Sequence, residues 1–136
     1  MRIDRVVDAD TLVRGAELFD SPPVPEFVSR FLASPGHHLL YAWDDSDRAL
    51  GFISGMELTH PDKGTEMYMD ELGVVEDARH RGVATILVGA LLAVAKESGC
   101  NGMWGVSETD NLAAIATYRR ASASGEDPGV VFSWQF

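Results

Sequence analysis

The chain has 136 residues, of which 46% are hydrophobic, and a formal net charge of −10. This length suits one domain over residues 1–136. Acidity of this size disfavours non-specific binding to nucleic acid, which requires a basic surface, and favours cationic partners. No run reaches the roughly 18 apolar residues of a membrane helix, the N-terminus has no signal-peptide core, and the one cysteine, Cys100, excludes an internal disulfide. We therefore expect a cytoplasmic protein without nucleic-acid or membrane partners.

The first third of the chain predicts a strand followed by two helices. Residues 2–7 alternate enough for a strand. Residues 8–20 place apolar side chains at helical spacing after an acidic start, which suits a helix N-terminus. The proline-rich segment 21–25 ends this helix, and residues 26–34 carry two phenylalanines on one face of a second, short helix.

The middle of the chain predicts three strands and a long helix. Residues 37–44 and 49–58 are apolar runs joined by the polar turn DDSDR, which together suit a β-hairpin. Residues 65–75 predict a longer strand. Residues 81–98 contain the most continuous apolar helical segment, and Gly99 closes it.

The last third predicts a strand over residues 101–108, a helix over 110–122 and a final strand over 130–136. The expected order is therefore β-α-α-β-β-β-α-β-α-β. Alternation of strands and helices in the second half favours a sheet that is parallel in part, with right-handed crossovers. These patterns predict a mixed α/β fold.

Residues 75–92 (VEDARHRGVATILVGALL) place two arginines, a histidine and a glycine at the start of the apolar helix. A helix N-terminus offers unpaired N–H groups and the positive end of the helix dipole, so it suits an anion. Gly82 lets an anion approach the backbone, and Arg79 and His80 add donors. The segment matches neither the Walker A loop nor the GxGxxG loop. On this pattern alone, the glycine could equally serve packing and the arginines solubility.

Two motifs resemble those of the GCN5-related N-acetyltransferases. The segment Arg79–Ala84 resembles the family's pyrophosphate loop, Q/R-x-x-G-x-G/A. Asn111–Tyr118 resembles its N-x-x-A-x-x-x-Y motif, and Leu72–Val74 resembles the strand segment beside the pantetheine arm. The motifs occur in the family's order, and the resemblance covers nearly the whole chain. The chain departs from the family's pattern after Tyr118, where two arginines replace the common Gly-Phe pair.

The resemblance implies the family's fold: a mixed, mostly antiparallel central sheet with a splayed parallel strand pair, flanked by about four helices. It implies acetyl-CoA as co-substrate, and no histidine or cysteine spacing indicates a metal site. Dimers are common in the family, so a homodimer is one expected assembly. The residues placed against acetyl-CoA by the resemblance are Leu72, Gly73, Val74, Arg79, His80, Arg81, Gly82, Val83, Ala84, Thr85, Asn111, Ala114 and Tyr118.

The resemblance also implies catalytic candidates. Tyr118 would protonate the leaving thiolate, and a carboxylate would take the ammonium proton of the acceptor. Asp70 and Glu71 lie on one predicted strand, so alternation is expected to point them to opposite faces. Glu71 is favoured as the base because it directly precedes the Leu-Gly-Val segment; the alternative is a carboxylate that only binds the cation. A backbone N–H of Gly73 or Val74 would hold the oxyanion.

The acceptor site is expected between the segment joining the first two helices and the loop at residues 59–64. The acidic candidates for binding the acceptor are Asp20, Glu26, Asp70 and Glu71. Segments such as LFDSPP and VVFSWQF resemble the aminoglycoside 3-N-acetyltransferase branch. The expected acceptor is therefore a small cationic amine, aminoglycoside-like or polyamine-like, that attacks the thioester directly in a ternary complex. Alternatives are a non-catalytic acyl-CoA sensor, a protein N-acetyltransferase, or an unrelated small α/β binding protein.

Overall fold

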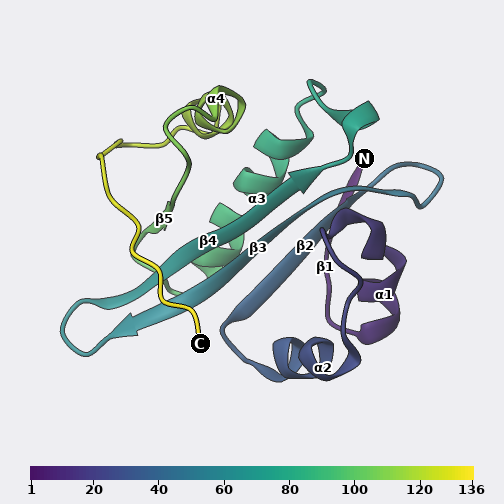
Figure 1. Ribbon diagram of the computed structural model, residues 1–136, viewed down its shortest axis with the longest axis horizontal. Helices are drawn as coiled ribbons and strands as arrows, with labels where there is room; N and C mark the ends of the chain where they lie inside the picture. The colour runs from purple at the N-terminus through teal and green to yellow at the C-terminus, as the bar shows by residue number, and fades with distance from the viewer.

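The computed structural model describes residues 1–136, which form a five-stranded sheet in the order β1-β2-β3-β4-β5 with helices on both faces (Figure 1). The five strands span Arg2–Arg5, His37–Trp43, Ala49–His60, Gly64–Val74 and Met103–Gly105. The first four strands pair antiparallel with their sequence neighbours, whereas β5 pairs parallel with β4. The mixed, mostly antiparallel sheet expected from the sequence is confirmed.

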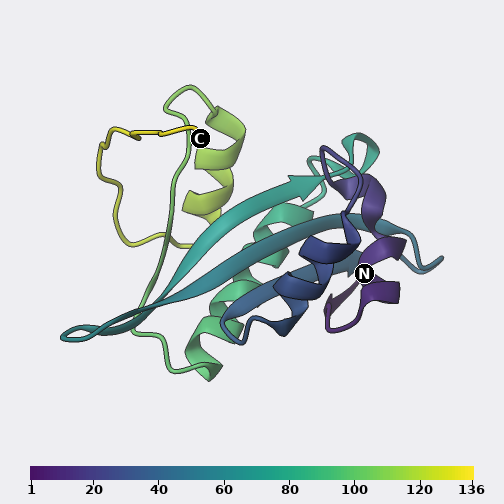
Figure 2. The same cartoon turned by 60° about the horizontal axis from the view of Figure 1, so that its bottom comes forward.

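Helices α1 and α2 lie on one face of this sheet, and α3 lies on the other (Figure 1). Figures 1 and 2 both show α4 beyond the β4 edge, away from α1 and α2. None of the helices has the length and apolarity required to cross a membrane. The helices and 3-10 turns are α1 (Ala9–Arg14), η1 (Ala16–Leu18), α2 (Pro25–Ala33), η2 (Glu76–Ala78), α3 (Val83–Glu97) and α4 (Leu112–Arg120).

Strand β2 is buried on both faces, which explains its continuous apolar run LLYAW. Leu40 and Ala42 pack in the apolar core on the α3 face, whereas Tyr41 and Trp43 pack in a second core with α1 and α2. The hydroxyl of Tyr41 donates a hydrogen bond to the Leu12 carbonyl at 2.8 Å. This bond ties α1 to the sheet, so the segment after α1 has a defined position beside β3.

The helix expected over residues 8–20 is broken at Gly15. Helix α1 ends at Arg14, and the short turn η1 follows. The ring of Tyr41 lies directly against Gly15 and leaves no room for a Cβ there. Gly15 caps the end of α1 through its N–H bond to the Leu12 carbonyl, and the packing of β2 against it requires a residue without a Cβ.

The strand expected over residues 130–136 does not form. The chain after Arg120 contains neither helix nor strand, and Phe132, Trp134 and Phe136 are exposed. A strand needs a neighbour for its backbone hydrogen bonds, and no strand of the sheet pairs with this segment. The apolar alternation suggested a strand, but the structure contains no partner for one.

Candidate active site

The parallel strands β4 and β5 pair over three residues and then separate. Residues 67–69 of β4 pair with residues 103–105 of β5, whereas β4 continues to Val74 without a partner on that side. The strand expected over residues 101–108 is correspondingly shorter. The splayed pair implied by the family resemblance is therefore present (Figure 1). Backbone groups on the free edge of β4 remain available to a ligand.

Hydrogen bonds to β3 determine which N–H groups of β4 face this gap. The N–H groups of Glu71 and Val75 donate to acceptors on β3 at 3.2 and 2.9 Å. Because N–H groups alternate along a strand, that of Gly73 also points to β3 and that of Val74 points to the gap. Of the two expected oxyanion donors, the geometry therefore retains Val74 and disfavours Gly73.

A β-bulge in β4 brings Asp70 and Glu71 to one face. The register between β3 and β4 shifts here, so these two residues face Ser54 alone. Met69 before the bulge and Leu72 after it both pack toward α3, so the two carboxylates between them both point to the α1–α2 face. The expectation of opposite faces was wrong, because one extra residue resets the alternation.

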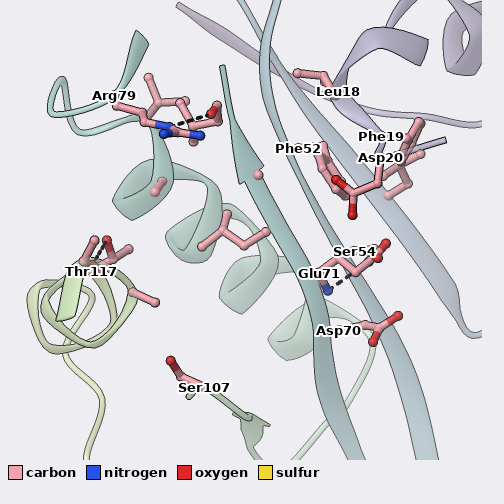
Figure 3. A pocket seen from close by; sticks show the side chains of 18 of the residues that line it. Leu18, Phe19, Asp20, Phe52, Ser54, Asp70, Glu71, Arg79, Ser107 and Thr117 are labelled. Atoms are coloured by element: carbon pink, nitrogen blue, oxygen red, sulfur yellow. Dashed lines mark hydrogen bonds between the residues drawn. The ribbon is translucent and has the colours of Figure 1, made fainter. Parts of the chain in front are cut away.

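Glu71 consequently lies in acidic surroundings. Burial raises its pKa, and the negative charges of Asp70 and Asp20 raise that pKa further. Figure 3 shows Asp20 on the same side of β4 as Asp70 and Glu71. The hydroxyl of Ser54 accepts the Glu71 N–H bond and so positions the bulge. A carboxylate of raised pKa is a better general base near neutral pH, and three carboxylates together suit a cation.

These residues line a cleft of about 2030 Å³ that extends to both sides of β4. Figure 3 shows Phe19 and Asp20 on one side of the strand and Arg79 and Thr117 on the other. We call the α1–α2 half the part of the cleft lined by Asp70, Glu71 and those lining residues that fall between Leu12 and Ser54. The part lined by residues 72–85 and 106–120 is the α3–α4 half.

The loop before α3 has the geometry of an anion site. No side chain caps α3, and its first turn contains no acidic residue, so the first N–H groups are unpaired. His80 and Gly82 have φ angles of 60° and 82°. A Cβ at Gly82 would meet nothing within 4 Å, so the space above the helix end is open. The side chain of Arg79 donates to the Val74 carbonyl at 3.2 Å, which holds the guanidinium beside the gap.

Helix α4 contributes Asn111, Ala114 and Tyr118 to the other wall of this half. Asn111 is the N-cap of the helix, and its Oδ1 accepts a hydrogen bond from the Ala114 N–H at 3.1 Å. Burial raises the pKa of Tyr118, so its hydroxyl stays protonated at neutral pH. The Asn-to-Tyr motif thus combines a helix cap with a tyrosine that lines the cleft.

All but two of the predicted site residues line the cleft; the exceptions are Arg81 and Glu26. The charge of Arg81 acts on Asp77, whose pKa is lowered first by its hydrogen bond from Arg48 and then by charges that include Arg81. Glu26 lies in the first turn of α2, where it complements the helix dipole. A ligand role for these two side chains has no support in the geometry.

Sequence reasoning also missed other lining residues, among them Ser54 and Phe52. Ser54 accepts the N–H bond of Glu71 at the bulge in β4, and nothing in the sequence of β3 indicates that it lies opposite a bulge. The ring of Phe52 packs against Gly73, where a Cβ would come within 2.6 Å of the ring Cε1. Gly73 is therefore required by close approach of a ring from the neighbouring strand, and only the register of the two strands identifies that ring.

Comparisons with known proteins agree with this geometry. N-alpha-acetyltransferase 30 of Schizosaccharomyces pombe is 29% identical over 100 residues, which cover 74% of this chain and 67% of that protein. The structure of an aminoglycoside acetyltransferase from an uncultured soil metagenomic sample, in complex with trehalose, matches with a TM-score of 0.90 at 18% identity. That match covers 99% of this chain and 95% of the other.

A further solved structure, that of AAC(6')-Iy with a bisubstrate analogue of CoA and acetylneamine, matches with a TM-score of 0.79 at 17% identity and covers 100% of both chains. The model of the acetyltransferase (GNAT) family matches residues 6–122. A match over most of the chain, together with the splayed strands and the open loop before α3, shows that this protein belongs to the GNAT family of acetyl-CoA-dependent acetyltransferases.

Proposed function

We propose that this protein transfers an acetyl group from acetyl-CoA to the primary amine of a small cationic acceptor, by direct attack in a ternary complex. The observation that carries the proposal is the opposite character of the two halves of one cleft. The α3–α4 half offers Arg79 and the open end of α3, which suit a pyrophosphate. The α1–α2 half offers Asp70 and Glu71, which suit an ammonium group. The splay of β4 and β5 lies between them.

Each residue of the site has a defined task in this reaction. Bound acetyl-CoA supplies the acetyl thioester. Glu71 accepts a proton from the acceptor ammonium, the amine nitrogen forms a bond to the carbonyl carbon, and the carbon–sulfur bond breaks. The N–H of Val74 stabilises the charge on the carbonyl oxygen. Tyr118 gives its proton to the thiolate and then recovers one from the new amide nitrogen, which still carries its second ammonium proton. Asp70 holds the cationic acceptor.

Cys100 supports direct attack rather than an acyl-cysteine intermediate. It follows the C-terminal end of α3, at the opposite end of the helix from the Arg79–Ala84 loop. Burial raises the pKa of its thiol, and the charge of Glu57 raises it further. A thiol of raised pKa, placed outside the cleft lining, is a poor nucleophile for this reaction.

The choice of a small cationic acceptor rests on the carboxylates Asp20, Asp70 and Glu71. The similarity to aminoglycoside acetyltransferases supports this choice, so aminoglycosides and polyamines belong in the first panel of amines. The similarity to an N-alpha-acetyltransferase favours a second candidate, the N-terminus of a protein. A panel that includes peptides separates the two.

The first test is a calorimetric titration of the protein with acetyl-CoA, with and without amines. We expect micromolar binding, followed by amine-dependent release of CoA thiol. The Tyr118→Phe variant separates an enzyme from a sensor, because its turnover should fall roughly 10- to 100-fold while acetyl-CoA affinity is kept. An absence of binding up to millimolar acetyl-CoA under both conditions would contradict the proposal. Binding without turnover of any amine would favour the sensor.

A further inference from the structure

Helix α2 presents an apolar stripe to the α1–α2 half of the cleft. Val24, Phe27, Val28 and Phe31 follow i, i+3, i+4, i+7 spacing, and all four line the cleft. Val28 is buried in the core, whereas Val24 and Phe27 are 46% and 59% exposed. Part of the stripe, at Val24 and Phe27, is therefore not needed for the core, and this exposed apolar surface faces the cleft.

The rest of this half is largely apolar as well. Leu18, Phe19, Pro22 and Pro23 extend the wall, and their side chains contain no hydrogen-bonding group. The two prolines also lack a backbone N–H. The polar side chains of this half are Asp20, Ser21, Ser54, Asp70 and Glu71. An acceptor therefore meets carboxylates at one end and an apolar wall along its body.

A second cavity, of about 120 Å³, opens beside the carboxylates. It shares Phe31, Ser54 and Asp70 with the cleft, and Met56 and His37 complete its apolar and aromatic lining. Protein cavities of roughly 150 Å³ are able to hold one benzene molecule. At about 120 Å³, this cavity is somewhat smaller and takes a branched alkyl group or part of a ring that enters from the cleft.

We propose that the acceptor is an amphipathic primary amine. Its ammonium group binds among Asp20, Asp70 and Glu71. Its aryl or branched alkyl group packs against Phe27 and Phe31 of the stripe, which adjoins the small cavity at Phe31. The inference rests on the proposed acetyl transfer and narrows its acceptor. A polyhydroxylated amine would place hydroxyl groups against side chains that cannot bond to them, which costs binding energy. A linear polyamine would leave the stripe in water and gain nothing from it.

The test compares amines that share the ammonium group and differ in the rest of the molecule. Release of CoA thiol is measured with phenethylamine and isoamylamine, and with putrescine and kanamycin. We expect kcat/KM for the two apolar amines to be at least roughly tenfold higher, because burying an aromatic or branched alkyl group is worth more than that factor. Equal or higher kcat/KM for putrescine or kanamycin would overturn the inference and leave acetyl transfer intact.

A matched pair of variants tests the wall directly. Phe27→Ser should raise KM for phenethylamine roughly tenfold more than it raises KM for putrescine. Val13→Ser is the control, because Val13 is also 59% exposed and lies on α1 outside the cleft lining. An unchanged KM for phenethylamine in Phe27→Ser would overturn the inference. A protein that binds acetyl-CoA but acetylates none of the four amines or a peptide would contradict the proposed function itself, and the inference with it.

Discussion

Asp70 and Glu71 are neighbours in the chain, and their chemistry depends on one structural detail, the bulge that turns both to the same face of β4. On opposite faces they would interact little. On one face, after the effect of burial, the charge of Asp70 raises the pKa of Glu71. The proposed reaction assigns the two carboxylates different tasks, with Glu71 as the base and Asp70 as a cation ligand.

The pH dependence of kcat/KM should identify the base. If Glu71 is the base, it must be ionised, so activity of the wild type falls toward acidic pH. Glu71→Gln should lower kcat roughly 100-fold and abolish this acidic limb. Asp70→Asn should keep the limb and shift it to lower pH, because the substitution removes a negative charge that raises the pKa of Glu71. Loss of the limb in Asp70→Asn, with its retention in Glu71→Gln, would assign the base to Asp70.

Two glycines with positive φ angles flank helix α3, Gly82 as its N-cap and Gly99 just after its C-cap. Gly82 and Gly99 have φ angles of 82° and 81°, and a Cβ at either position would meet nothing within 4 Å. Only Gly82 lines the cleft, where the unpaired N–H groups of α3 are exposed. The functional difference between the two glycines therefore comes from their surroundings.

This difference predicts opposite outcomes for two equivalent substitutions. Gly82→Trp should raise the Kd for acetyl-CoA at least roughly tenfold, because the indole fills the space in front of the helix end. Gly99→Trp carries a similar backbone strain, of about 1–2 kcal/mol, and should leave the Kd unchanged. Calorimetry gives the Kd values, and thermal melts verify that both variants lose similar stability. An unchanged Kd in Gly82→Trp would mean that the pyrophosphate binds elsewhere.

The molecule as a whole is stabilised by two apolar cores, one on each face of the sheet. The α3-side core includes Ile53, Leu87 and Leu91, and the other core includes Tyr41 and Trp43. Neither core contains any residue of the C-terminal segment 130–136. The segment should therefore contribute little to folding stability. A homodimer and a cytoplasmic location stay predictions, to be tested by solution mass and by fractionation.

Deletion of residues 130–136 tests this division of the molecule. The truncated protein should keep its Tm within about 3 °C of the full chain and bind acetyl-CoA equally well. Leu91→Ala is the contrasting variant: Leu91 is fully buried, and its truncation should lower the free energy of unfolding by about 2–5 kcal/mol. A larger drop in Tm on deletion would show that the segment packs against the sheet as the expected strand.

The local sequence pattern was sufficient to predict most helices and strands and the loop before α3. The helix expected over residues 81–98 forms as Val83–Glu97, and the strand expected over 65–75 forms as Gly64–Val74. Both carry a long, consistent hydrophobic period, which tertiary contacts reinforce. The positions of Gly82 and Tyr118 in the cleft also agree with the motifs, because each motif lies within one helix or at its end.

Three features depended on partners distant in the sequence. The ring of Tyr41 packs on Gly15 at the end of α1, Ser54 faces the bulge at Asp70, and the segment 130–136 has no strand to pair with. Hydrophobic periodicity reports on one segment at a time. A ring contact, a shift of register or a missing neighbour involves two segments, so periodicity does not predict it. The family and the loop before α3 could therefore be predicted from the sequence alone. The shared face of the carboxylates and the apolar wall beside them were decided only when the strands paired and α2 packed on the sheet.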